Sequence, residues 1–163
     1  MHRADLAIAV TTMVAFPNGV VFQLLIRGAD PRIDEVLYGP RPLRRSQQGV
    51  LADEVFRLGV ATADGTAASY SAWYGGDAAD PPSAPHLTEY GGGGGGGGEW
   101  EHGYWLWPLP PEGAFEFVCE WPALDVSETH VSVDPAPIRA AAARSLTLWD
   151  ENQTRREGGW TSY

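Results

Sequence analysis

The chain has 163 residues, of which 21 are acidic and 11 are basic, and its formal net charge is −10 at pH 7. This length fits one domain and is short for two. Because so acidic a molecule repels phosphate backbones and anionic lipid, we expect neither nucleic acid nor a membrane surface as its partner. A single cysteine excludes an internal disulfide framework, and a cytoplasmic location is predicted.

The first 16 residues combine a basic residue with an apolar run, as signal peptides do. Asp5 interrupts the basic region and no A-x-A cleavage pattern follows, so we expect a strand here and no export signal. No stretch of the chain reaches the ~18 apolar residues that a membrane-spanning helix needs.

An antiparallel hairpin is predicted at the start of the chain. Residues 6–14 alternate in hydrophobicity, and four side chains share one face at period two: Leu6, Ile8, Val10 and Val14. The turn at 16–20 contains Pro17, which presets one dihedral angle, and Asn18-Gly19, which accept positive φ. An apolar run follows the turn and completes the hairpin.

The next part of the chain predicts a long connection and a second hairpin. Residues 28–49 contain prolines and mixed charges, with one short strand or helical turn expected at 33–38, and their basic run RPLRR at 41–45 is interpreted as a solvated loop. Residues 54–62 place three apolar side chains on one face: Phe56, Leu58 and Val60. Asp64-Gly65 is a strong turn signal, after which the chain returns through TAASYSAWY.

Residues 75–103 are interpreted as one long loop rich in glycine and proline. Eight consecutive glycines, residues 91–98, lie within it. They lack the strand, lysine and helix that accompany a phosphate-binding loop, so a flexible surface segment is the first interpretation. The alternative is an extended polyglycine segment that lies against Trp or Tyr rings or bonds to neighbouring chains.

Three more strands and a helix complete the predicted elements. The strands are at 104–107, 114–121 and 128–133, and their expected inward residues in the last two are Phe115, Phe117, Cys119, Trp121, Thr129, Val131 and Val133. The helix is expected to begin with Asp134 as N-cap and Pro135 at the first position. Its apolar stripe would cover an open end of the sheets with Ile138, Ala142, Ser145 and Trp149.

These elements predict an all-β fold. About six or seven short strands without long helices indicate an antiparallel two-sheet β-sandwich, immunoglobulin-like or related, with one short C-terminal helix. We expect a single domain over residues 1–149 and a polar tail over residues 150–163. The strand order is not readable from the sequence.

The strongest local anomaly is the junction of glycines and large aromatic residues. Trp105 and Trp107 project together on a strand, where they either fill the core or stack on a sugar, a base or a proline-rich peptide. The candidate binding residues are Trp100, Tyr104, Trp105, Trp107, Gly91, Gly92, Gly93, Gly94, Gly95, Gly96, Gly97 and Gly98.

Catalytic and metal sites find little support in the sequence. Cys119 could take His130 or His102 as a base, but its place among aromatic residues indicates an inert buried thiol. A triad-like spacing at Glu128, His130 and Ser132 lacks a nucleophile elbow or an oxyanion-hole signal. The nearest acidic cluster, without a known ligand spacing, is Glu99, Glu101, His102, Asp77 and Asp80. We therefore expect no catalytic residue, no metal and no cofactor.

Two segments carry a resemblance. YWLWPLPPEGAFEFVCEWPALDVSETHVSVD with PIRAAAARSLTLW, and the opening DLAIAVTTMVAFPNGVVFQLLIR, resemble small uncharacterised proteins of high-GC Gram-positive (actinobacterial) bacteria. Together they cover somewhat under half of the chain. The resemblance implies a bacterial cytosolic setting and assigns a role to no residue.

The expected function is that of a non-enzymatic interaction module. Its aromatic and polyglycine-rich surface would contact a protein partner or another copy of the chain, because exposed strand edges pair readily with extended segments. Two alternatives stay open: a small-molecule or carbohydrate binder that uses Trp105 and Trp107, and, with less support, a hydrolase that uses His130 or Cys119.

Overall fold

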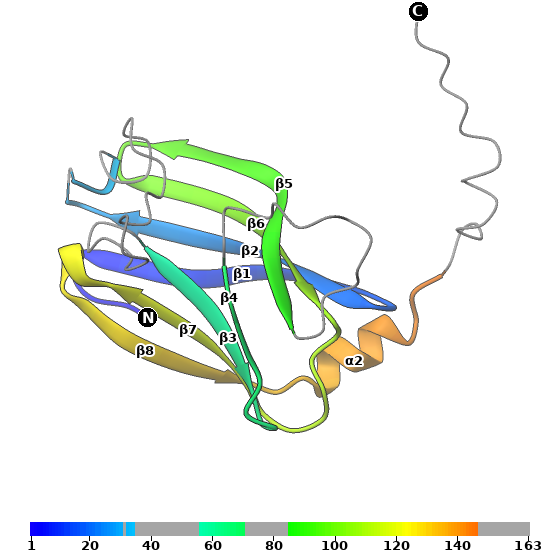
Figure 1. The fold of residues 1–163 in the computed structure, drawn as a ribbon. Coiled ribbons are helices and arrows are strands. Elements are labelled where there is room, and N and C mark those ends of the chain that lie inside the picture. Colours follow the sequence, from blue (N-terminus) through cyan, green and yellow to red (C-terminus); the bar gives the residue numbers. More distant parts are fainter. Residues whose placement is uncertain (31, 35–55, 71–84, 147–163) are drawn as a thin grey trace, which may run out of the picture.

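The structure is a computed structural model that describes residues 1–30, 32–34, 56–70 and 85–146. The described residues form two four-stranded antiparallel sheets that face each other (Figure 1). The first sheet has the order β1 (Leu6–Phe16), β2 (Gly19–Gly28), β6 (Glu99–Trp107), β5 (His86–Gly96). The second has the order β4 (Ala67–Ser69), β3 (Arg57–Thr62), β7 (Phe115–Trp121), β8 (Val126–Val133). The predicted two-sheet β-sandwich is confirmed.

The strand order identifies the type of sandwich. Lettered along the chain as A, B, C, C′, D, E, F and G, the strands give the sheets ABED and C′CFG. This is the arrangement of immunoglobulin-like sandwiches. Two short helices lie near the second sheet: η1 (Pro122–Leu124) joins β7 to β8, and α2 (Ala136–Ala142) follows β8.

A β-bulge in β1 changes which of its side chains face inward. The pairing with β2 shifts between Val10 and Thr12, so the inward face moves from even to odd positions. Met13 therefore packs against the core, whereas Val14 is 49% exposed. The expectation that Val14 shares the inward face of Leu6 and Ile8 was wrong, because strict alternation assumes an uninterrupted ladder.

The first hairpin forms as predicted, but its glycine has another role. Pro17 and Asn18 make the turn, and neither Asn18 nor Gly19 has a positive φ. A Cβ on Gly19 would lie 2.6 Å from the carbonyl oxygen of Leu106 and would overlap the ring of Trp105. Glycine is needed at this position for close approach, so the expected backbone conformation was wrong.

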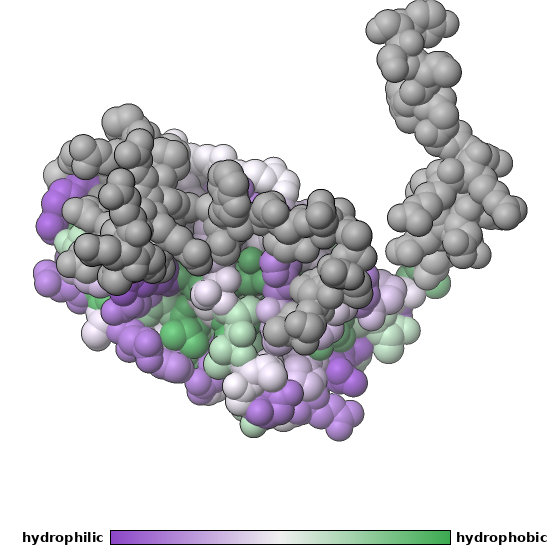
Figure 2. Space-filling view, in the orientation of Figure 1, coloured by the Kyte–Doolittle hydropathy of each residue, from purple (hydrophilic) through white to green (hydrophobic). Residues whose placement is uncertain are grey.

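The core lies between the sheets and is centred on β2, β6 and β7. The rings of Phe22 and Phe117 meet edge to face across the sandwich, with centroids 4.8 Å apart, and Tyr104 stacks on Phe22 at 5.4 Å. Figure 2 shows hydrophobic residues in the band between the sheets. Burial of each such side chain stabilises the fold by about 1.5–3 kcal/mol. The inward positions predicted for β7 at Phe115, Phe117 and Trp121 are confirmed.

The second sheet and the helix follow the sequence patterns except at Val131 and at the start of the helix. β3 and β4 form the predicted hairpin, but Val131 on β8 is 47% exposed, because β8 is the end strand of its sheet among the described residues. The helix begins one residue later than predicted: Pro135, not Asp134, is the N-cap, and it makes no side-chain capping bond. The carboxylate of Asp134 accepts the backbone N–H of Ala136 at 2.9 Å from the preceding position. α2 packs against β1 and buries Ile138 and Ala142.

Several predicted features lie wholly or partly outside the described residues. Residues 32–34 are helical and Ile33 is buried in the core, which supports a helical turn at the start of the 33–38 segment. The remainder of that connection, the basic run at 41–45, the segment at 71–84 with Asp77 and Asp80, Trp149 and the tail at 150–163 are not described.

Candidate interaction site: the glycine hairpin

The glycine tract is part of a β-hairpin. Six of its eight glycines belong to β5, whose last residues pair with β6 in the register Gly93↔His102, Gly94↔Glu101, Gly95↔Trp100 and Gly96↔Glu99. Gly97 and Gly98 form the two-residue turn with φ of +66° and +82°, a conformation that favours glycine at both positions. The expectation of one long loop over 75–103 was therefore wrong from residue 86 onward. The glycine segment is extended, as the alternative expected, but as a strand that pairs with β6 of the same chain.

The tract escaped prediction as a strand because alternation is carried by side chains. Six glycines have no inward or outward face in the sequence, so only the pairing with β6 reveals their conformation. A bulge also interrupts β5, since the register shifts between Glu89 and Gly93 and both Gly91 and Gly92 have positive φ. The bulge separates a half with side chains, His86–Glu89, from a half without them, 93–96.

The hairpin tip is fixed to the rest of the protein by Asp34. Its carboxylate accepts the backbone N–H groups of Gly97 at 3.0 Å and of Gly98 at 3.1 Å. Consecutive backbone N–H groups in such a turn form a concave anion-binding site, which this carboxylate fills. On the other side, Gly28 donates its N–H to the carbonyl oxygen of Gly98 at 2.8 Å, and a Cβ on Gly98 would overlap the carbonyl oxygen of Gly28.

The free edge of β5 presents backbone groups without side chains. β5 is the end strand of its sheet among the described residues, and residues 91–97 are exposed. A two-residue hairpin closes on a hydrogen-bonded pair, here Gly96 and Glu99, and such pairs alternate along an antiparallel ladder. Gly94 therefore bonds to β6, whereas Gly93 and Gly95 direct their N–H and C=O groups to the free edge.

A row of rings backs the hairpin on the inner face of β6. Trp100 and His102 stack with centroids 5.0 Å apart and an interplanar angle of 12°, and His102 lies 5.2 Å from Tyr104. A Cβ on Gly93 would overlap the His102 ring and the carbonyl oxygen of Glu101. The ring against the glycine backbone is thus that of His102, whose predicted roles were only those of a base or a metal ligand.

The four candidate aromatic residues do not form one surface. Alternation along β6 places Trp100 and Tyr104 on the inner face, where Tyr104 is 2% exposed, and places Trp105 and Trp107 on the outer face. Core filling is therefore the role of Tyr104. Trp105 and Trp107 project together and are partly buried. The rings of Phe16 and Trp105 pack edge to face, with their centroids 5.7 Å apart.

A polar cluster ties β5 to the opposite sheet. The hydroxyl of Tyr70 donates to Oε1 of Glu89 at 2.5 Å, and Nε2 of His102 lies 3.3 Å from the same oxygen, without the alignment of a hydrogen bond. The His102 side chain is 12% exposed. Burial lowers the pKa of His102, while the charge of Glu89 opposes this shift. Burial also raises the pKa of Tyr70, and the bond to Glu89 adds to the effect.

The residues considered for catalysis, His130, Ser132 and Cys119, are not arranged as a catalytic site. The two ring nitrogens of His130 contact Glu116 at 2.8 Å and Glu128 at 3.0 Å, and the hydroxyl of Ser132 donates to Glu116 instead of His130. The geometry of a Glu–His–Ser relay is therefore not formed. Burial raises the pKa of Cys119, which lowers the fraction of reactive thiolate.

The candidate metal ligands of the sequence can be compared with the positions of the described residues. The described residues contain no group of three or more His, Cys, Asp or Glu side chains placed to hold a metal ion. Alternation along β6 turns Glu99 and Glu101 to the outer face and His102 to the inner face, so these three side chains diverge. The proposed partners Asp77 and Asp80 lie outside the described residues.

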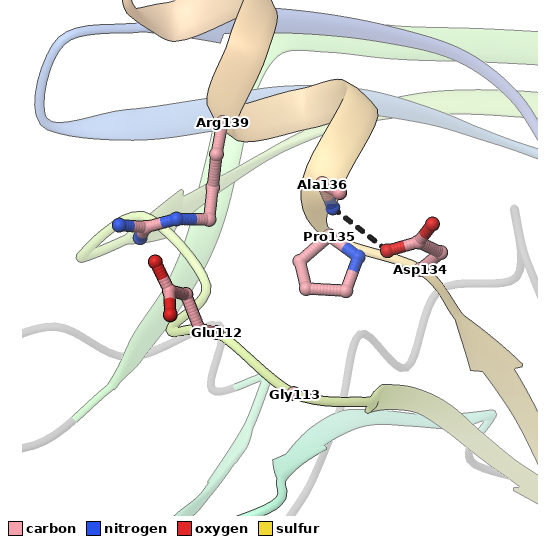
Figure 3. Close-up of a pocket in the computed structure, with 6 residues that line it drawn as sticks. All are labelled: Glu112, Gly113, Asp134, Pro135, Ala136 and Arg139. Atoms are coloured by element: carbon pink, nitrogen blue, oxygen red, sulfur yellow. Dashed lines mark hydrogen bonds between the residues drawn. The ribbon is translucent and has the colours of Figure 1, made fainter.

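A hollow beside α2 is lined by six labelled residues (Figure 3). Two of its polar groups are held by bonds within the fold: Arg139 donates to the carbonyl oxygen of Pro110 at 3.1 Å, and the Ala136 N–H donates to the carboxylate of Asp134 at 2.9 Å. The Glu112 and Arg139 side chains point toward one another across it. Because α2 has seven residues, its N-terminus offers little as an anion site, and the glycine hairpin is the stronger candidate.

Comparison of the chain with protein-family models, with curated proteins and with solved structures found no match. The resemblance to small actinobacterial proteins therefore stays a prediction. Among the described residues, no helix has the length and apolar character needed to cross a membrane.

Proposed function

We propose that this protein is a non-enzymatic interaction module that binds an extended protein segment at the glycine edge of β5. The observation that carries the proposal is the exposed strand at residues 93–96. Among the described residues it is an end strand, it directs the backbone groups of Gly93 and Gly95 outward, and it has no side chains to block an approaching strand. Addition of a strand to such an edge is a common mode of peptide recognition, in which main-chain hydrogen bonds supply the affinity.

The order of the glycine strand favours this use. Glycine loses more conformational freedom on folding than any other residue, so a loose tract would bind weakly. Asp34 and Gly28 hold the hairpin tip before any partner arrives. The strand therefore loses its conformational entropy during folding rather than on binding, and the edge is preorganised for a partner.

The glycine tract also lacks the residues that usually prevent an edge strand from pairing with another chain, which supports the proposal. Edge strands are commonly shielded by lysine, proline or inward-pointing charges, because bare edges recruit other chains. Residues 91–98 contain none of these residue types in a chain of net charge −10. The acidic surface supports a protein partner over nucleic acid or a membrane, and the single cysteine supports a cytoplasmic location.

A binding assay with short peptides tests the proposal. Labelled peptides of about ten residues with alternating threonine and valine are titrated against the protein and followed by fluorescence polarisation. Saturable binding is expected, and methylation of the peptide nitrogens that face β5 should abolish it by removing the donors. Equal binding of methylated and unmethylated peptides would overturn the proposal, and so would the absence of peptide binding together with the absence of self-association.

A second candidate function rests on Trp105 and Trp107, which project together on the outer face of β6 and are partly exposed. Indole rings in this arrangement can stack on a sugar or another planar ligand. Titration of the intrinsic fluorescence with a panel of sugars, repeated with Trp107→Ala, tests this candidate. An unchanged emission across the panel would remove it.

A further inference from the structure

We infer that the segment bound at the glycine edge is β5 of a second copy of this chain, paired antiparallel about a two-fold axis at Gly94. This inference rests on the proposed function, since it names the partner of the same edge. It would join the two first sheets into one continuous sheet through the outward backbone groups of Gly93 and Gly95.

The register follows from the alternation of backbone groups. With the axis at Gly94, Gly93 of one copy lies opposite Gly95 of the other, and each such pair exchanges two hydrogen bonds. All the outward groups of these two residues are then used. The two Gly94 residues face each other at a non-hydrogen-bonded position, where the Cα atoms approach to about 4.5 Å.

The length of the flat segment favours a second copy over a foreign strand. Gly91 and Gly92, with positive φ, end the segment on one side, and the turn at Gly97 and Gly98 ends it on the other. A longer partner would gain no further ladder bonds beyond these limits. A second copy offers a segment of equal length, and a surface that complements itself about a two-fold axis forms a closed dimer.

Charge and size limit the strength of this pairing. The tract itself is uncharged, but each copy carries a net charge of −10, and Glu99 and Glu101 lie on the neighbouring strand. A contact built on four backbone hydrogen bonds is far smaller than a standard protein interface. The dimer should therefore form at high concentration and should strengthen as salt screens the repulsion.

Substitutions at Gly94 give a sharp test, because a Cβ there meets nothing within 4 Å and Gly94 lacks a positive φ. Sedimentation equilibrium is measured from about 10 µM to about 1 mM for the wild type and for Gly94→Glu, Gly94→Lys and Gly94→Thr. Gly94→Glu sets two carboxylates against each other across the axis and should weaken the dimer about tenfold or more. Gly94→Thr is the matched neutral control and should dimerise at least as well as the wild type.

The decisive measurement mixes the two charged variants. An equimolar mixture of Gly94→Glu and Gly94→Lys should dimerise to within about threefold of the wild type, because opposite charges then meet across the axis. The inference would be overturned if Gly94→Glu dimerised as tightly as the wild type, or if the mixture of the two charged variants dimerised no better than each variant alone. A monomer at every concentration and salt would overturn it as well, and the peptide assay would then show whether the edge still binds a foreign strand.

Discussion

The carboxylate of Asp34 receives the backbone N–H of Gly97 at 3.0 Å across 63 residues of sequence. With the bond to Gly98, this contact holds the tip of a hairpin whose strand has no side chains of its own with which to pack. An acidic side chain thus replaces packing as the source of order, and removal of the charge should release the tip.

Asp34→Asn tests this role. The variant keeps the shape of the side chain but loses a charge-assisted acceptor, so we expect the free energy of unfolding to fall by about 1 kcal/mol at this half-buried site. Hydrogen exchange of the Gly97 and Gly98 amides should accelerate more than exchange in the core. Glu101→Gln, on the exposed outer face, is the matched control, and equal effects of the two variants would contradict a specific clamp.

Phe22→Ala should show how far the sandwich depends on its central aromatic contact. Phe22 is fully buried between Tyr104 and Phe117, so truncation leaves a cavity and should cost about 3–5 kcal/mol of stability. Leu146→Ala, at a residue that is 83% exposed, should change stability by less than about 0.5 kcal/mol. Urea unfolding of both variants makes the comparison, and a similar loss in each would argue against this core.

The sequence predicted the sandwich because most strands alternate visibly. Phe115, Phe117 and Trp121 face inward as the period of two requires, and the turn at Asp64-Gly65 joins β3 to β4. The pattern failed at Val14, where one bulge moves the inward face by one residue. Bulges leave no composition signal in an otherwise regular run, so this shift was not predictable.

The candidate site was predictable only in part. The glycines and the aromatic residues were identified, but Trp100 and Trp105 lie on opposite faces of β6. Asp34 was missed because it stands 63 residues from Gly97 without a motif that joins them. His102 was missed as a packing partner because a ring can rest on glycine backbone only where a neighbouring strand brings the two together, and strand pairing was not readable.

The stability of the protein should depend on pH through His102. Burial lowers the pKa of this group, so the unfolded chain binds the proton more readily than the folded one. Stability contributed by the neutral ring is present above the ordinary pKa of about 6.5 and is lost as the pH falls through the lowered folded value. His102→Gln should flatten the fall in melting temperature on that acidic side.

The stability contributed by His130 should depend on pH in the opposite direction to that contributed by His102. Hydrogen bonds to Glu128 and Glu116 raise the pKa of His130, so the contribution of His130 is present below the ordinary value and is lost as the pH rises through the raised one. His130→Gln should therefore act on the alkaline side of the window. NMR titration of the two imidazoles checks the directions, and a His102 pKa above that of His130 would contradict both.

Two adjacent glycines of β5 should respond in opposite ways to the same substitution. A Cβ on Gly93 would overlap the His102 ring and the carbonyl oxygen of Glu101, so Gly93→Ala must push β5 away from β6 and should destabilise the protein by about 1–3 kcal/mol. A Cβ on Gly94 meets open space, and Gly94→Ala should stabilise by about 0.4–1 kcal/mol because it restricts the unfolded chain. Thermal unfolding of the pair measures the difference. If Gly94→Ala destabilises the protein and Gly93→Ala stabilises it, the register Gly93↔His102 is wrong, since a shift of one residue would exchange their faces.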